Sequence, residues 1–354
     1  MAQIDGLLER LIQQQGSDLH LSCGNVPIFR VHGHIQRGDY GVLAPLDMES
    51  FLFEILTPEQ KERFEATRDL DLAYEVPGLA RFRVNIFEQH RGLGAVLRVI
   101  PSRIPTADEL KLPQAVREFT RLNRGLVVVT GPTGSGKSTT LAALIDLINE
   151  SRPEHILTIE DPIEFVHPTK KALVNQREVG PHTKSFAAAL RAALREDPDV
   201  ILVGEMRDPE TISLALTAAE TGHLVFATLH TNSAHKTVDR IIDTFPGDQQ
   251  SQVRAMLSES LRGVIAQQLL RRKAGGRVAA HEILVGTPAV ANLIREGKTF
   301  QIPSAIQTGK QLGMIQMDQS LQGLLSGGVI DVEEAYNKAF DKAPFRAQME
   351  RLRA

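Results

Sequence analysis

The chain has 354 residues, of which 42% are hydrophobic and 23% charged, and its net charge is -3. This composition is typical of folded globular proteins, and the negative charge argues against a protein that mainly coats nucleic acid. No apolar run approaches the roughly 20 residues of a membrane-spanning helix, and the first residues lack a signal-peptide pattern, which predicts a cytoplasmic protein. The single cysteine, Cys23, excludes an intrachain disulfide and a four-cysteine zinc site, and we interpret it as a small apolar strand residue.

Residues 1–100 predict a small α+β domain. Apolar side chains at positions 4, 7, 8 and 11 recur at helical spacing and predict an opening helix. The segment PIFRVHGHIQR, with its central glycine, predicts a β-hairpin. Further helices are expected over about 47–56 and 58–67.

Two strands around a Gly-rich turn are expected in LARFRVNIFEQHRGLGAVLRVI, residues 79–100. Successive strand residues point to opposite faces, so Phe82, Val84 and Ile86 share an apolar face. Arg83 and Arg98 therefore belong to the polar faces of two neighbouring strands.

The organisation of the chain changes after residue 100. Three prolines without periodicity predict a linker over 101–113. Over 114–354, short runs of Val, Ile and Leu alternate with helical segments, which predicts an α/β fold with a parallel sheet wrapped by helices. From about residue 251 the pattern predicts a mainly helical C-terminal region, which includes VRAMLSESLRGVIAQQLL.

A phosphate-binding loop is expected in GPTGSGKS, residues 131–138, which matches G-x-x-x-x-G-K-[ST] between an apolar strand and a helix. Its glycines allow backbone N–H groups to face phosphate oxygens at the positive end of the helix. Lys137 is expected to contact the β- and γ-phosphates, and Ser138 to offer a hydroxyl to Mg²⁺. The sequence therefore predicts a nucleoside triphosphate site formed by Gly131, Pro132, Thr133, Gly134, Ser135, Gly136, Lys137, Ser138 and Thr139.

Carboxylates follow two other predicted strands, at the edge where an open parallel sheet binds its ligands. Glu164, in ILTIEDPIEF, is a candidate base or water-positioning residue, although a helix-capping or surface role stays open. Glu205, in DVILVGEMRD, ends an apolar strand, where a carboxylate without a role is costly. Gly204 stands where an aspartate is usual, and Glu205 is the candidate, with Ser138, for the Mg²⁺ site, where it can polarise a water on Mg²⁺ or orient the attacking water.

The segment TGHLVFATLHTNSAH contains His223, His230 and His235. If residues 224–229 form a strand, His223 and His230 are roughly 23 Å apart and cannot share a metal ion within one subunit. His230 is then expected near the phosphates, in contact with the γ-phosphate or the attacking water, unless it is a structural histidine. His223 is expected at the opposite edge, at a subunit contact or in a structural role, and His235 is expected to be a polar loop residue.

These motifs occur in the order of the Walker A, Asp box, Walker B and His box elements of the secretion-superfamily ATPases, which power type II secretion and type IV pili. The segment SDLHLSCGNVPIFRVHG is similar to the start of their PAS-like N-terminal domain, so the resemblance covers nearly the whole chain. Residues 291–309 resemble an element of the pilus-retraction branch, with Ala291 in place of its usual arginine. The absence of a four-cysteine element also fits that branch.

The resemblance implies a PAS-like N-terminal domain, a RecA-like ATPase domain with a helical C-terminal region, and a homo-hexameric ring that binds ATP and Mg²⁺ between the two domains. It implies that Glu164 is the catalytic base and Glu205 the Walker B carboxylate. It also implies that Arg83 and Arg98, fifteen residues apart, extend toward the γ-phosphate, where an arginine is worth orders of magnitude in rate. The alternative is two solvated strand arginines.

The implied function is an ATP-hydrolysing motor for type IV pilus retraction and twitching motility. Such a motor acts at the cytoplasmic face of the inner membrane and docks on a membrane platform protein, without a transmembrane segment of its own. A pilus-assembly or type II secretion ATPase is the alternative in the same class. A RecA-like nucleic-acid translocase is opposed by the net charge and by the lack of a basic stretch with interleaved aromatic residues. A nucleotide-gated regulator with little turnover also stays open.

Overall fold

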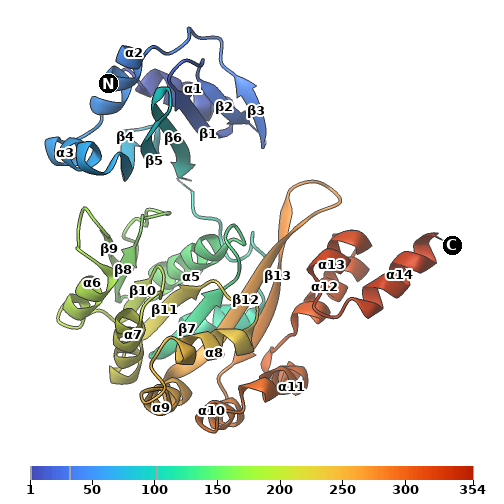
Figure 1. Cartoon of the computed structure of the whole chain (residues 1–354). Helices are drawn as coiled ribbons and strands as arrows, with labels where there is room; N and C mark the ends of the chain where they lie inside the picture. The colour runs from blue at the N-terminus through green and yellow to red at the C-terminus, as the bar shows by residue number, and fades with distance from the viewer. Residues whose placement is uncertain (1, 32, 101–102, 354) are drawn as a thin grey trace. The chain divides into compact units, whose positions relative to one another are not determined.

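The computed structural model of the chain describes residues 2–31, 33–100 and 103–353, and it divides into two compact units, Met1–Arg103 and Ile104–Ala354 (Figure 1). Residues 101 and 102, which begin the predicted linker, lie outside the described residues. Farther along that segment, Ala107 and Leu112 are buried in a hydrophobic core of the second unit. The later part of the segment predicted as a linker is therefore packed structure.

The first unit contains a six-stranded sheet with the order β3-β2-β1-β6-β5-β4, in which every neighbouring pair is antiparallel. Its elements are α1 (Asp5–Gln13), β1 (Gly16–Ser22), β2 (Ile28–Val31), β3 (His34–Arg37), α2 (Pro45–Phe53), α3 (Pro58–Thr67), β4 (Asp69–Val76), β5 (Ala80–Gln89) and β6 (Gly92–Ile100). The opening helix, both hairpins and the two following helices are confirmed. The apolar residues at positions 4, 7, 8 and 11 are buried, as their helical spacing predicted.

The second unit is built on a seven-stranded sheet with the order β13-β12-β7-β11-β10-β8-β9. Only the β12–β13 pair is antiparallel. The elements up to the sheet's last two strands are α4 (Gln114–Glu118), η1 (Phe119–Arg121), β7 (Gly125–Thr130), α5 (Lys137–Ser151), β8 (His155–Glu160), β9 (Leu173–Glu178), α6 (Phe186–Ala193), β10 (Val200–Val203), α7 (Pro209–Thr221), β11 (Leu224–Leu229), α8 (Ala234–Asp243) and α9 (Gln250–Ser260). The predicted parallel sheet is confirmed.

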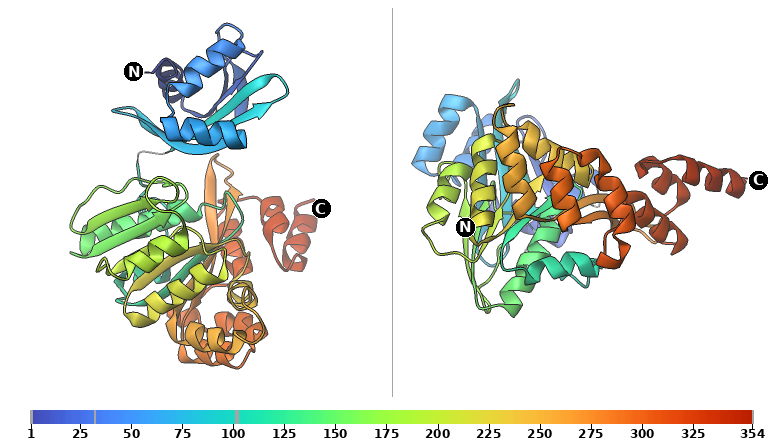
Figure 2. Two further views of the ribbon diagram at one scale, coloured as in Figure 1. Left: turned by 60° about the vertical axis from the view of Figure 1, so that its left-hand side comes forward. Right: turned by 90° about the horizontal axis from the view of Figure 1, so that it is seen from below.

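Helices cover both faces of this sheet, as the ribbon views show (Figures 1 and 2). Along β7, Leu126 and Val128 belong to the core formed with α6 to α9, whereas Val127 and Val129 belong to the core formed with α4 and α5. Strands buried on both faces need apolar residues at every position, which explains the continuous run GLVVVT.

The prediction of a mainly helical region from about residue 251 is wrong for two segments, β12 (Leu261–Arg271) and β13 (Arg277–Val285). They form an antiparallel hairpin, and β12 pairs in parallel with β7. Because β12 is nearly buried throughout its length, its sequence lacks the alternation of a half-buried strand, and periodicity alone cannot distinguish it from a buried helix.

Helices follow the hairpin as expected: α10 (Pro288–Arg295), η2 (Thr299–Gln301), α11 (Ile302–Thr308), η3 (Lys310–Leu312), α12 (Met317–Ser326), α13 (Val332–Lys338) and α14 (Ala343–Arg353). Glu282 of β13 is buried and accepts N–H groups from Ala234 at 2.7 Å and from Met317 at 3.4 Å, which begin α8 and α12. Within the described residues, no helix is long and apolar enough to cross a bilayer.

We expect Phe226→Ala to destabilise the chain, because Phe226 of β11 is fully buried between the sheet and the α5 face. Truncation of a buried phenylalanine leaves a cavity and costs about 3–5 kcal/mol in the free energy of unfolding. Phe300→Ala is the matched control, since Phe300 is 73% exposed and its loss should change stability by less than about 0.5 kcal/mol. Chemical denaturation followed by circular dichroism measures both, and equal unfolding midpoints would contradict the assigned core.

Candidate functional site

The loop of residues 131–136 joins β7 to α5 at the carboxyl edge of the second unit's sheet. Gly131, Gly134 and Gly136 have φ angles of 148°, 77° and 86°, a region that favours glycine. Between them, Pro132 and Thr133 are exposed. The backbone therefore makes a turn that other residues would strain, and it ends at the positive N-terminus of a long helix.

Lys137 begins α5, and its ammonium lies inside this turn. Its Nζ donates to the carbonyl oxygens of Gly131 at 2.9 Å and Pro132 at 3.2 Å, and lies 3.5 Å from His230 Nδ1. Burial lowers the pKa of Lys137, while the charges of Glu205 and Glu164 oppose that shift. Both carboxylates therefore act electrostatically on the lysine of the loop.

Glu205 follows β10, and both of its carboxylate oxygens have side-chain partners. Its Oε1 lies 2.9 Å from His230 Nε2, and its Oε2 accepts a hydrogen bond from Arg207 at 2.6 Å. Burial opposes ionisation of Glu205, but Arg207 and His230 outweigh it and lower its pKa below the ordinary 4.5. Glu205 is therefore a carboxylate at neutral pH, and a chain of contacts connects Lys137, His230 and Glu205.

Glu164 lies in the loop after β8, and its side chain is exposed. Its backbone N–H donates to Glu160 Oε2 at 3.4 Å. Burial raises the pKa of Glu160, although hydrogen bonds from Thr158 and Gln176 counteract the shift. A hydrogen bond thus joins the backbone of Glu164, whose carboxylate is exposed, to Glu160 at the end of β8.

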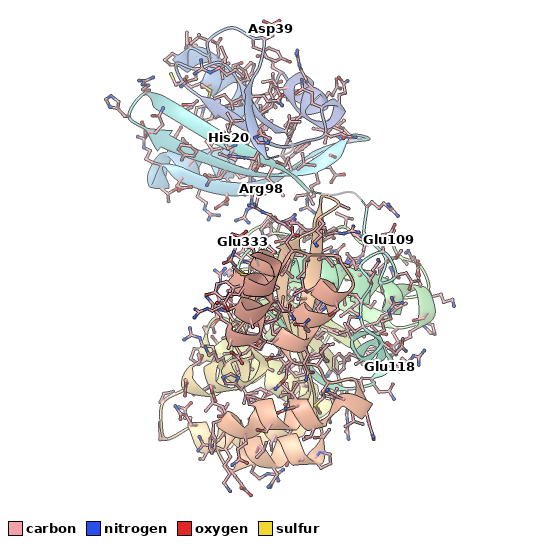
Figure 3. The ribbon with its side chains drawn as sticks, turned by 90° about the vertical axis from the view of Figure 1, so that its right-hand side faces the viewer. His20, Asp39, Arg98, Glu109, Glu118 and Glu333 are labelled. Atoms are coloured by element: carbon pink, nitrogen blue, oxygen red, sulfur yellow. The ribbon has the colours of Figure 1, made fainter. Side chains whose placement is uncertain are left out.

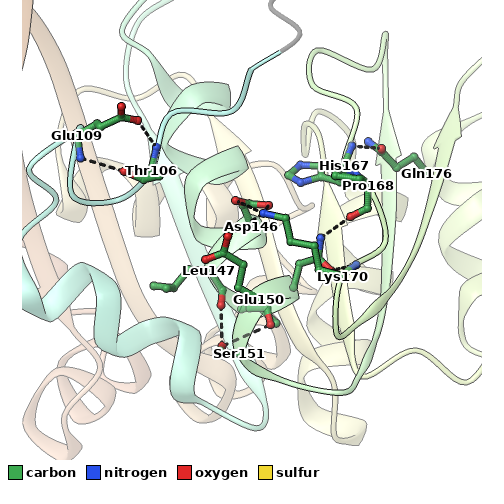
Figure 4. Close-up of polar contacts among 12 residues, drawn as sticks. Thr106, Glu109, Asp146, Leu147, Glu150, Ser151, His167, Pro168, Lys170 and Gln176 are labelled. Carbon is green, nitrogen blue, oxygen red and sulfur yellow. Dashed lines mark hydrogen bonds and ion pairs between the residues drawn. The ribbon is translucent and has the colours of Figure 1, made fainter.

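The same loop is also fastened to α5, the helix that the phosphate loop opens (Figure 4). Asn149 donates to the carbonyl of Pro168 at 2.7 Å and accepts the N–H of Lys170 at 3.0 Å. Lys170 Nζ forms hydrogen-bonded ion pairs with Asp146 and Glu150, each at 2.8 Å. Because these contacts join the loop to α5, Glu164 and Lys137 are held on one connected piece of structure.

His223 and His230 lie at opposite ends of β11. His230 follows the strand, and the next residue is anchored by Thr130, whose hydroxyl donates to the carbonyl of Thr231 at 2.7 Å. His223 precedes the strand, and its Nδ1 lies 3.0 Å from the carbonyl oxygen of Ala218 near the C-terminal end of α7. The structure therefore brings His230, and not His223, to the phosphate loop.

Three residues of this region were missed in the sequence. Arg207 binds Glu205, Thr130 anchors the residue after His230, and Gln267 of β12 donates to the carbonyl of Ser135 at 2.7 Å. Arg207 follows Glu205 by two positions, a spacing that could have suggested an ion pair. Gln267 had no such signal, because its segment was interpreted as helical.

The loop and its neighbours fit a nucleotide phosphate with Mg²⁺. Ser138 stands in the first turn of α5, and Glu205 supplies an ionised carboxylate at the same edge. Mg²⁺ in nucleotide sites uses one or two protein oxygens together with phosphate oxygens and waters. Within the described residues, no group of three or more His, Cys, Asp and Glu side chains is arranged to hold a metal ion.

The two candidate arginines are directly opposite each other in the first unit's sheet, since Arg83 of β5 pairs with Arg98 of β6. Arg98, which is labelled in Figure 3, also lies opposite Asp18 of β1, and its Nε donates to Asp18 Oδ1 at 2.8 Å. Arg83 Nε lies 3.8 Å from Asp71. Both arginine side chains are largely exposed, so the sheet presents two adjacent guanidinium groups on its polar face.

The family model described as "Type II/IV secretion system protein" matches residues 3–335. The chain belongs to this family. It is 56% identical over 336 residues to the "Type IV pilus retractation ATPase PilT" of Pseudomonas aeruginosa, with 95% of this chain and 98% of that protein covered. It is also 56% identical over 314 residues to a "Twitching motility protein" of Neisseria gonorrhoeae, with 88% of this chain and 84% of the relative covered.

A crystal structure of the pilus retraction motor PilT with bound ADP matches the fold of this chain with a TM-score of 0.90 and 47% sequence identity. The match covers 96% of this chain and 98% of the solved one. The ATPase DotB of Legionella pneumophila matches with a TM-score of 0.83 and 33% identity, over 94% of this chain and 93% of the other. The fold is therefore a mixed α/β ATPase fold of the PilT type.

We expect Asp18→Asn to destabilise the first unit by roughly 1–3 kcal/mol at neutral pH, because Asp18 is buried and binds Arg98. Burial would raise the pKa of Asp18, but the hydrogen bonds from Arg98 and Ser17 lower it below the ordinary 3.8. A lowered pKa means that the contribution to stability is complete above about pH 4 and is lost as the pH falls through the folded-state value. The difference between wild type and variant should therefore shrink below pH 3.8.

Thermal unfolding followed by circular dichroism across this pH range measures the effect. Asp71→Asn is the matched control, since Asp71 lies 3.8 Å from Arg83 and its side chain is 60% exposed. An exposed pair of this kind contributes little to stability. Equal losses from the two substitutions at neutral pH would show that Asp18 does not hold Arg98 in the manner described.

Proposed function

We propose that this chain is an ATP-hydrolysing motor that powers type IV pilus retraction. The observation that carries the hydrolytic part is the contact chain from Lys137 through His230 to Glu205, at the edge where the phosphate loop turns. The retraction part is supported by the names of two relatives that are each 56% identical to this chain. The alignments cover most of each relative's length.

In this proposal the loop residues bind the triphosphate and Lys137 neutralises its β- and γ-oxygens. Ser138 and Glu205 would hold Mg²⁺, directly or through water, and the bound ion would supply positive charge against the phosphates. Glu164 is exposed and acts on Lys137 electrostatically, which suits a carboxylate that orients and deprotonates the attacking water. His230 connects Lys137 to Glu205, so it is placed to respond to the γ-phosphate.

We further propose a homo-hexamer in which the first unit is PAS-like and the second RecA-like. Arg83 and Arg98, which are neighbours in the sheet, would reach the γ-phosphate in the assembled ring and stabilise the charge of the transferring group. Loss of the γ-phosphate would release groups from two mobile domains, which couples hydrolysis to movement. The ring would act at the cytoplasmic face of the inner membrane on a platform protein, with no direct contact to nucleic acid.

Replacement of the two histidines should separate their roles. We expect His230→Ala to lower ATP turnover by roughly 100-fold, the scale associated with a lost polar group beside a reacting centre. His223→Ala, at the other end of β11, should cause a clearly smaller loss in non-assembled subunits. Steady-state phosphate release at equal subunit concentration measures both. Equal losses in non-assembled subunits would contradict the division of roles.

Deletion of the gene in a piliated host tests the direction of the motor. We expect surplus surface pili and lost twitching, because fibres would still be assembled but not withdrawn. Complementation with the wild-type chain should restore twitching, whereas Glu205→Gln, which removes a charge next to His230, should not. Cells without pili would instead identify an assembly motor, and normal twitching would contradict a retraction role.

A further inference from the structure

Gln267 of β12 joins the phosphate loop to the strand beside it. Its Nε2 donates to the carbonyl of Ser135 at 2.7 Å, and its Oε1 accepts the hydroxyl of Thr140 in α5 at 2.8 Å. All three residues are buried. The glutamine therefore connects the middle of the loop and the first turns of the helix through one side-chain amide.

The orientation of this amide is determined by the Ser135 carbonyl, which can only accept. In the opposite orientation, Oε1 would face the Ser135 carbonyl oxygen at hydrogen-bond distance, with no hydrogen between two acceptors. A hydroxyl can donate or accept, so Thr140 adapts to the orientation that Ser135 sets, and it donates to the Oε1 that is left. Thr140 thus holds the other end of the same amide.

The loop is also in close steric contact with Gln267 at both of its ends. A Cβ atom on Gly131 would lie 2.3 Å from the carbonyl oxygen of Gln267, and one on Gly136 would lie 2.9 Å from its Nε2. The register explains this proximity, since Ala266 pairs with Thr130 and the next residue of β12 is therefore beside the start of the loop. Two glycines of the motif are required here by the neighbouring strand as well as by their φ angles.

Because the peptide bond is planar, the hydrogen bond to the Ser135 carbonyl also sets the direction of the Gly136 N–H. In a trans peptide the C=O and the following N–H point in opposite directions. Because Gln267 draws the Ser135 carbonyl toward β12, the N–H of Gly136 is turned away from β12. Phosphate-binding loops bind their ligand with such N–H groups, and an N–H whose peptide is free to rotate loses its fixed direction.

We propose that Gln267 is a positioning residue for nucleotide binding, which fixes the Ser135–Gly136 peptide of the phosphate loop while Thr140 holds the other end of its amide. The proposal rests on the proposed function, because it assigns Gln267 to the ATP site of that motor. It adds a contribution from β12, a strand that lies more than a hundred positions away in the sequence from the loop that it orients.

The test compares Gln267→Met, which keeps the length of the side chain but removes the donor, with Gln268→Met on the half-buried neighbouring position. We expect Gln267→Met to weaken ADP binding in the presence of Mg²⁺ by about tenfold, the scale of one lost buried hydrogen bond. The KM for ATP should rise by a similar factor with kcat little changed, since the N–H contacts phosphate before and during the reaction. Gln268→Met should leave all three quantities unchanged.

Thr140→Val and Thr140→Ser provide a second route if Gln267→Met does not fold. Thr140→Val should weaken ADP binding, Thr140→Ser should not, and Thr140→Val should add nothing in the Gln267→Met background, because both changes act through one amide. The proposal would be overturned if either Gln267→Met or Thr140→Val bound ADP with wild-type affinity. It would also be overturned if Gln267→Met lost kcat with an unchanged KM. A wild-type chain that binds ADP but does not hydrolyse ATP would contradict the proposed function, and ADP affinity would still decide the role of Gln267.

Discussion

Parallel pairing of β10, β11, β7 and β12 is the constraint on which the site depends. The register places Val203 beside Ala227, Leu229 beside Thr130, and Thr130 beside Ala266. Since parallel strands end at the same edge of a sheet, the residues that follow them converge there although they are far apart in the chain. Lys137, Glu205 and His230 meet because of strand direction, Gln267 reaches the phosphate loop from within β12, and the two helical layers keep those strands buried and in register.

The sequence was sufficient to place a candidate residue where that residue stood next to its own local signal. Lys137 is part of a spaced motif, and Glu205 and His230 each follow a short apolar strand with clear ends. It was insufficient for β12, because α9 passes directly into this strand at Leu261 without a turn and the strand is buried on both sides. The role of Gln267 depends on Ser135, 132 positions earlier, and no local pattern encodes a contact of that kind.

The first unit shows the same limit in an antiparallel sheet. Alternation in residues 80–100 was enough to assign Arg83 and Arg98 to a polar face, because the side-chain period of a strand is fixed. Their direct pairing depends on the length and shape of the turn between β5 and β6, and a shift of one residue would move either arginine to the other face. Asp18, which binds Arg98, comes from a strand 80 positions away.

Glu282 couples two helices of the second unit, α8 and α12. One buried carboxylate caps the start of α8, which lies just beyond His230, and also the start of α12, in the C-terminal helices. If α8 moved by itself, an N–H or a carboxylate oxygen would lose its partner in a place without solvent, and burial already raises the pKa of this group. The first turns of α8 and α12 are therefore expected to move together. A displacement of α8 at the nucleotide edge would then also displace the C-terminal helices.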